Sequence, residues 1–335
     1  MLLTILLLLG SAVVIYLSCE TFVNGIEWVG RKFNVTQTAT GTILAAFGTA
    51  LPESVVTLVA TAFGVHPEQK QIGVGAALGG PLALSTVAYA VVGLALLAAG
   101  RKLGRGKNPV VEVDGRRLSR DQAWFLGIFV FKITLGLLVF SWKPWLGWVF
   151  LAAYGVYTWM ELRGDGGAHD DDEGELEPLK IRSKAADPHI AWALLQTTAA
   201  LVVIFAASHL FVGQLEKIGP WLGMPPQLVA LLLSPLATEL PETMNALIWV
   251  RQGKERLALA NISGAMMIQA TVPTAFGLFF TPWRLDRGLL IAGGVTALAV
   301  VLLFTMFRSG KVHALKLANI GWLYALFAGL LVLTG

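Results

Sequence analysis

The chain has 335 residues, of which 56% are hydrophobic and only 14% are charged, and its formal net charge is +4. Soluble domains carry about 25% charged residues, so this composition excludes an ordinary soluble domain and indicates an integral membrane protein with several spans. The sequence contains no dense basic patch with interleaved aromatic residues, so nucleic acid is not an expected partner. The single cysteine, Cys19, excludes an internal disulfide.

Apolar runs long enough to cross a bilayer, about 20 residues each, predict an all-α polytopic membrane protein with ten transmembrane helices. Their expected ranges, in chain order, are 2–30, 36–64, 70–100, 121–142, 144–162, 189–216, 225–251, 256–281, 287–307 and 312–334. A polar linker at 163–188 separates a first five-helix repeat at 1–162 from a second at 189–335. The linker carries an acidic cluster at 170–177, which we expect to be solvated, with cation sensing as the alternative.

The distribution of Lys and Arg predicts the orientation of the chain in the cell membrane. The loops after the odd-numbered spans contain 19 of these 25 residues, whereas the loops after the even-numbered spans contain five. Basic loops stay in the cytoplasm. We therefore expect the linker to lie on the cytoplasmic side of the plasma membrane and both termini on the outer side. Because each half has an odd number of spans, the two repeats are predicted to be inverted relative to each other.

A short motif occurs once in each half. Residues 48–54 read GTALPES, and residues 237–243, which lie 189 positions later, read ATELPET. A carboxylate inside an apolar run is costly in hydrocarbon and indicates function. The proline beside it removes a helical hydrogen bond and frees a carbonyl oxygen. Two such sites, one in each half, predict a cation site at the middle of a transporter built from repeats.

These motifs resemble those of the cation/calcium antiporter superfamily and, within it, the membrane region of the sodium/calcium exchanger. The resemblance implies two inverted five-helix repeats that meet around a bound cation. It also implies that Glu53 and Glu242 bind Ca²⁺, with help from oxygens of Thr49 and Thr238.

A second motif of that superfamily is altered in this chain. Ala76 and Ala265 stand where the family has a ligand serine, and Gly80 and Gln269 stand where it has a carboxamide or a carboxylate. Glu239 adds a carboxylate to the second copy of the first motif. Hydroxyl and carboxamide oxygens are therefore lost and one acid is gained. This change argues against the multi-sodium sites and the three-for-one exchange of that family in this chain.

The residue types fit a hard cation, because Ca²⁺ takes six to eight oxygen ligands. Glu239 and Glu242 share a helix face if the helix persists there, and with Glu53 they are expected to form a three-carboxylate cluster. A divalent cation neutralises two charges, so we expect Glu239 to carry a proton during part of the cycle. Gln269 contributes an oxygen or bridges helices by hydrogen bonds. The expected metal ligands are Glu53, Glu242, Thr49, Thr238, Glu239 and Gln269.

The sequence thus predicts a secondary antiporter that exchanges a divalent cation, with Ca²⁺ expected, for Na⁺ or H⁺ by alternating access. The expected partners are inorganic cations and the lipid bilayer, with no organic cofactor and no obligate protein partner. The alternatives are an H⁺-coupled exchanger of another cation, a channel, or a cation-binding membrane protein that transports nothing.

An enzyme that acts on a lipid phosphate is not expected, since it would need basic residues at the depth of the glutamates. Only Lys132 lies there. We expect this lysine to reach toward the membrane surface or to pair with an acid such as Glu20. A cationic substitute for a bound sodium ion is the remaining interpretation.

Overall fold

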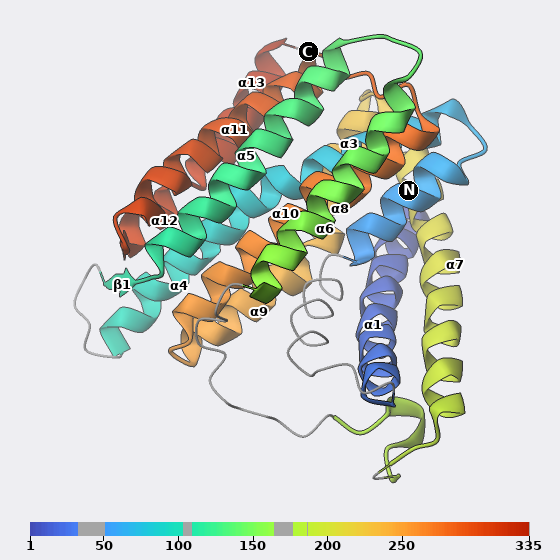
Figure 1. Cartoon of the computed structure of the whole chain (residues 1–335). Helices are drawn as coiled ribbons and strands as arrows, with labels where there is room; N and C mark the ends of the chain where they lie inside the picture. Colours follow the sequence, from blue (N-terminus) through green and yellow to red (C-terminus); the bar gives the residue numbers. More distant parts are fainter. Residues whose placement is uncertain (33–50, 103–108, 164–176, 186, 335) are drawn as a thin grey trace.

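The computed structural model describes residues 1–32, 51–102, 109–163, 177–185 and 187–334, and this part of the chain is helical apart from one two-stranded sheet (Figure 1). The first half contains α1 (Leu2–Lys32), a helix described over Leu51–Ala62, α3 (Pro67–Ala83), the π-helix η1 (Leu84–Ala88), α4 (Tyr89–Lys102), β1 (Val110–Glu112), α5 (Gly115–Leu137), the 3₁₀ turn η2 (Lys143–Leu146) and α6 (Gly147–Arg163). After a second 3₁₀ turn, η3 (Lys180–Arg182), come α7 (Ile190–Leu222), α8 (Pro226–Thr238), α9 (Leu240–Arg251), α10 (Glu255–Phe280), α11 (Arg287–Arg308), β2 (Lys311–His313), α12 (Ala314–Asn319) and α13 (Trp322–Thr334).

Six stretches of the described chain are helical, long and apolar enough to cross a membrane. They are Leu2–Lys32, Pro67–Ala98, Ile190–Leu222, Glu255–Phe280, Arg287–Arg308 and Ala314–Leu331. Two shorter apolar helices cover Leu51–Ala62 and Pro226–Pro235. The predicted all-α membrane architecture is therefore confirmed, whereas ten spans in two inverted repeats, with their boundaries at 162 and 189, stay a prediction.

The offset of 189 that relates the two motifs also relates the ends of helices. It carries Ala62, the last residue of its helix, onto Arg251, the last residue of α9. It carries the start of α3 to within one residue of the start of α10, and the end of α1 to within one residue of the end of α7. These helix ends thus occur at equivalent positions and in the same order in the two halves.

Several predicted spans are interrupted in the structure. The span expected at 225–251 breaks between α8 and α9, where Pro241 is the second residue of α9 and lacks the N–H that would continue the helix. The span expected at 312–334 is divided into α12 and α13, and that at 70–100 contains the π-helix η1. The helix expected at 121–142 begins earlier, because the side chain of Asp114 caps α5 by accepting a hydrogen bond from Arg117 N.

α3 and α8 pack closely through glycines. A Cβ at Gly75 would collide with the backbone oxygen of Gln227, and a Cβ at Gly79 would lie 2.5 Å from the backbone oxygen of Leu231. Small residues let helix backbones approach in a membrane, where packing replaces the hydrophobic effect. This contact brings α3 of the first half against α8 of the second half.

α1 and α7 form a pair at one side of the bundle (Figure 1). In their membrane-length windows only 28% of residues are buried, against 72% in the run Pro67–Ala98 and 83% in α10. The tightly packed core therefore lies around α3 and α10, and the α1–α7 pair lies outside it.

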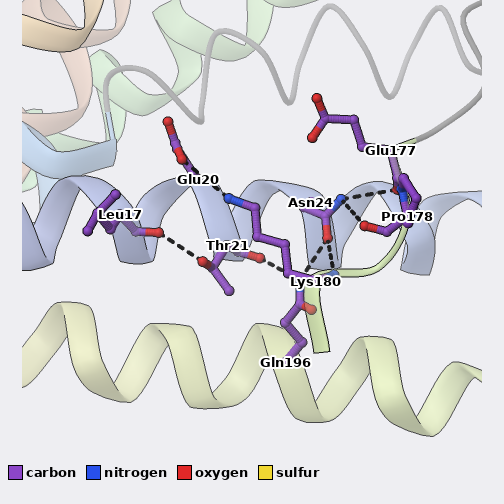
Figure 2. Close-up of polar contacts among 8 residues, drawn as sticks. All are labelled: Leu17, Glu20, Thr21, Asn24, Glu177, Pro178, Lys180 and Gln196. Atoms are coloured by element: carbon purple, nitrogen blue, oxygen red, sulfur yellow. Dashed lines mark hydrogen bonds and ion pairs between the residues drawn. The ribbon is translucent and has the colours of Figure 1, made fainter. Parts of the chain in front are cut away.

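The end of the linker is fastened across this pair by a polar clamp (Figure 2). Asn24 Oδ1 accepts hydrogen bonds from Lys180 N (3.1 Å) and from Gln196 Nε2 (2.9 Å). Trp28 Nε1 donates to the backbone oxygen of Glu177 at 2.9 Å. Residues 164–176, which include most of the acidic cluster, lie outside the described part of the chain. Buried side chains of α1 and α7 thus hold the same piece of linker.

The small sheet joins two distant loops. β1 and β2 are antiparallel, with Val110 opposite His313 and Glu112 opposite Lys311. The loops expected after the third and the ninth spans therefore meet, which requires that they lie on the same side of the bundle. That both loops lie in the cytoplasm stays a prediction from the Lys and Arg distribution.

Candidate cation site

Glu53 lies in the helix Leu51–Ala62 with only 1% of its surface exposed. Its Oε2 accepts a hydrogen bond from Thr238 Oγ1 at 2.6 Å and another from Ser234 Oγ at 3.3 Å. Both donors belong to α8, so the acid of the first motif is held by hydroxyls from the second half. Its other oxygen, Oε1, is buried and has no hydrogen-bond donor among the described residues.

The second motif forms a break between two helices. α8 ends at Thr238, α9 begins at Leu240, and Glu239 connects them with φ −98° and ψ −2°. Because Pro241 carries no N–H, it cannot donate to the carbonyl of Ala237 as a helical residue would. The break also places Glu242 in the first turn of α9, where the positive end of the helix dipole favours a negative charge.

Glu239 and Gln269 fill the space that Gly80 leaves open. Gln269 Nε2 donates to Glu239 Oε2 at 2.6 Å, and both side chains are buried. A Cβ on Gly80 would lie 2.6 Å from Gln269 Oε1 and 3.0 Å from Glu239 Oε1. The position that carries a polar side chain in the superfamily motif is thus occupied here by an acid and an amide from the second half.

Thr238 connects Glu53 with Glu239. Its hydroxyl lies 2.6 Å from Glu53 Oε2 and 3.3 Å from Glu239 Oε1, and a single O–H donates to only one of them at a time. Of the six predicted ligands, four therefore form one chain of contacts from Glu53 through Thr238 and Glu239 to Gln269. Thr49 lies outside the described residues.

Glu242 is fully buried, but both of its carboxylate oxygens lack a hydrogen-bond partner among the described residues. It lies within electrostatic range of Glu239 and of Glu53. The expected three-carboxylate cluster stays a prediction: the three acids interact electrostatically, but among the described residues no three His, Cys, Asp or Glu side chains form a metal-binding group on their own.

Two hydroxyls beside Glu53 were not predicted from the sequence. Ser234 donates to the carboxylate and lies one helical turn before Thr238. Thr57 is fully buried one turn after Glu53, and its Oγ1 has no partner among the described residues. Both positions follow from the spacing of four residues that places side chains on one helix face.

Lys132 behaves differently from the expectation. It is fully buried, so it does not reach the membrane surface, and its Nζ donates to the backbone oxygen of Ala77 at 3.0 Å. Glu20, the expected partner, pairs instead with Lys180 at 3.3 Å (Figure 2). The expected pair of Lys132 and Glu20 is therefore wrong.

The site is rich in oxygen acceptors and poor in donors. Oxygens without a donor in the described chain include Glu53 Oε1, Gln269 Oε1 and both carboxylate oxygens of Glu242. Buried polar atoms are almost always paired, and each unpaired one requires an explanation. Hard cations bind carboxylate and carbonyl oxygens. This set of oxygens therefore fits a hard cation that enters and leaves the site.

Comparison with known proteins places the chain in a family. The family model described as sodium/calcium exchanger protein matches residues 3–163 and 192–334. CaxA of Alkalimonas amylolytica, a provisionally named antiporter, is 25% identical over 344 residues that cover 97% of this chain and 98% of CaxA. The crystal structure of an H⁺/Ca²⁺ exchanger, CAX, is similar with a TM-score of 0.76 at 18% identity, covering 99% of this chain and 82% of CAX. The sodium-calcium exchanger NCX_Mj is similar with a TM-score of 0.58 at 21% identity, covering 98% of both chains. With the family model matching most of its length, the chain belongs to the sodium/calcium exchanger protein family.

Proposed function

We propose that the protein is a secondary antiporter that exchanges a divalent cation, Ca²⁺ in the first place, for H⁺. The cation is held between Glu53 of the first half and Glu242 of the second, with oxygens from Thr238, Glu239 and Gln269. The observation that carries this proposal is the set of buried carboxylate and carboxamide oxygens, contributed by both halves of the chain, that have no donor among the described residues.

The chemistry of the site favours a divalent cation. Two buried carboxylates from different halves of the chain repel each other unless a cation or a proton lies between them. A divalent ion neutralises both and also uses the neutral oxygens of Thr238 and Gln269. A site of this kind is stable when loaded and costly when empty, which is the property that an exchanger needs.

Coupling to protons is supported by Glu239. Three carboxylates lie within electrostatic range of one another, and a divalent ion compensates only two of them. The third is therefore neutralised by a proton when the divalent ion is bound. Buried acids in membrane spans commonly serve as proton relays. The alternative counter-ion, Na⁺, needs hydroxyl and amide ligands. Two such ligands of the family motif are missing here, because Ala76 and Gly80 occupy their positions.

The unequal packing of the helices supports the proposal of alternating access. The α1–α7 pair is sparsely buried, whereas α3 and α10 are densely packed next to the site. We infer that the pair moves against this core and opens the site to each side in turn. In the proposed orientation the linker lies in the cytoplasm and both termini lie outside the plasma membrane.

Uptake of radioactive calcium into proteoliposomes tests the function. A pH gradient, a sodium gradient and no gradient are imposed in separate experiments. We expect uptake driven by the pH gradient in the wild type and none in Glu53→Gln or Glu242→Gln. Glu112→Gln, an exposed carboxylate on β1, is the matched control and keeps the wild-type rate.

Uptake driven only by the sodium gradient would contradict proton coupling while supporting the exchanger. Calcium binding without any uptake would instead favour a cation-binding protein that transports nothing. Uptake with no dependence on either gradient would favour a channel.

A further inference from the structure

Lys132 is held in the interior of the bundle by three contacts. Its side chain is fully buried in α5, and the ammonium lies 5.0 Å from the centre of the Phe129 ring. Its backbone oxygen accepts a hydrogen bond from Trp283 Nε1 at 3.0 Å, which fixes this turn of the helix. The ammonium is thus directed to one place, the carbonyl of Ala77 on α3.

That carbonyl is available because of a proline. In an α-helix the carbonyl of residue 77 accepts the N–H of residue 81, and residue 81 here is Pro81, inside α3. Pro81 has no N–H, so the oxygen of Ala77 is free to bind a positive charge. A carbonyl freed by proline in a membrane helix is the kind of oxygen that coordinates cations in transporters.

The ammonium is also close to the proposed transport site. Ala77 lies one helical turn before Gly80, against which Glu239 and Gln269 pack. Lys132 and Glu53 interact electrostatically. The Lys132 ammonium therefore acts on the carboxylate that we assign to the cation.

Lys143 shows what a purely structural buried lysine looks like in this protein. It is 4% exposed, and its Nζ donates to three carbonyls, those of Leu138, Pro282 and Trp283, at 2.7–3.2 Å. An ammonium has three donors, so Lys143 is fully satisfied. Within the described residues, Lys132 has a single hydrogen-bond acceptor, which leaves its charge available to the site.

We propose that Lys132 is a covalently tethered cation that occupies the Ala77 carbonyl freed by Pro81 and replaces one monovalent ion of the transport site. This proposal rests on the proposed exchange function and deepens it. The tethered charge lowers the number of ions that must be bound from solution in each cycle. It also weakens the attraction of the site for a divalent ion, because it already compensates part of the charge on Glu53.

The test measures divalent-cation binding by calorimetry on purified, folded protein. In Lys132→Met the charge is removed with little change in shape. We expect Ca²⁺ to bind about three- to tenfold more tightly than in the wild type, the order expected for one charge acting across a low-dielectric site. Lys132→Arg keeps the charge and keeps the wild-type affinity. Lys143→Met is the matched control, which loses thermal stability and leaves the affinity unchanged.

Loss of the lysine also leaves the Ala77 carbonyl without a partner, so a second variant separates this effect. The double variant Lys132→Met with Pro81→Ala returns an N–H to that carbonyl, and it too binds Ca²⁺ more tightly. If neither variant without the lysine folds, Pro81→Ala alone decides. There the retained ammonium is displaced toward Glu53, and Ca²⁺ binds more weakly than in the wild type.

The proposal is overturned if a folded variant without the lysine binds Ca²⁺ as tightly as the wild type or more weakly. Where only Pro81→Ala folds, unchanged Ca²⁺ binding in that variant overturns it. A second readout is transport: uptake by Lys132→Met acquires a dependence on added Na⁺ or K⁺ that the wild type lacks, and its absence also counts against the proposal. If the wild type binds no divalent cation, the proposed function itself fails. Wild-type binding without a gain in the variants counts against Lys132 alone.

Discussion

Thr238 makes the shortest hydrogen bond to Glu53 from the second half of the chain. Its hydroxyl lies within hydrogen-bond distance of an acid from the first half and of an acid from its own half. Buried hydrogen bonds to charged groups contribute about 1.5–3 kcal/mol each, so one hydroxyl controls much of the geometry of the site.

This contact leads to a prediction at the scale of one residue. Thr238→Val keeps the shape of the side chain and removes the hydroxyl, and we expect Ca²⁺ affinity to fall about tenfold or more. Equilibrium binding to purified protein measures the change. The control is Thr296→Val, since the buried hydroxyl of Thr296 donates only to Ala292 of its own helix. Equal affinities in the two variants would contradict the role of Thr238.

The residues of the site could be predicted to different extents. Glu53 and Glu239 could be predicted because an acid in an apolar run indicates function, whereas Thr238 and Gln269 were predicted from the resemblance of the motifs to those of a known superfamily. Their contacts depend on how the helices of the two halves meet, and a single sequence does not contain that information. The partner of Lys132 was therefore predicted wrongly: the actual acceptor is a backbone carbonyl freed by proline.

At the scale of the element, the contact between α3 and α8 sets the distance between the two halves at the site. Gly75 and Gly264 occupy equivalent positions under the offset of 189, but only Gly75 meets another backbone; a Cβ at Gly264 would have nothing within 4 Å. The repeat in the sequence thus conceals an asymmetry in packing.

We expect Gly75→Ala to destabilise the protein by about 1–3 kcal/mol, the usual cost of overpacking. Gly264→Ala should change stability by less than about 0.5 kcal/mol or increase it, because alanine is the better helix former. Thermal unfolding in detergent compares the two variants. A larger loss of stability in Gly264→Ala than in Gly75→Ala would show that the α3–α8 contact is described wrongly.

The clamp between α1, α7 and the linker gives a second prediction at this scale. Asn24→Leu removes a buried amide that holds the linker, so we expect trypsin to cleave after Lys180 and Arg182 about fivefold faster or more. Glu20→Gln, which removes only an exposed ion pair with Lys180, should leave the rate nearly unchanged. Limited proteolysis followed by mass spectrometry measures both rates, and equal rates in the two variants would exclude the clamp.

Helix elements were predictable where hydropathy alone decides them. The long runs of α1, α7, α10 and α11 agree with the predicted spans, because about 20 apolar residues have few alternatives in a bilayer. The break between α12 and α13 and the position of the break at Glu239 were not predicted. Hydropathy does not report where a backbone hydrogen bond is missing, and the proline of the motif indicated a break without fixing its position.

At the scale of the whole molecule, two bodies with different packing can be recognised. The core around α3 and α10 carries the site, and the sparsely buried α1–α7 pair lies beside it (Figure 1). We expect backbone amides of α1 and α7 to exchange with deuterium faster than those of α3 and α10. We also expect Ca²⁺ to slow exchange in the residues around Glu239. Mass spectrometry of peptic fragments measures this, and uniform protection across all four helices would contradict two bodies.

The central claim is that one divalent cation lies between acids from the two halves of the chain. Equilibrium binding of radioactive Ca²⁺ to purified wild type, Glu53→Gln, Glu242→Gln and the control Glu112→Gln tests it most directly. We predict saturable binding by the wild type and by the control, and its loss in both site variants. Binding of wild-type strength in folded Glu53→Gln or Glu242→Gln would contradict the claim.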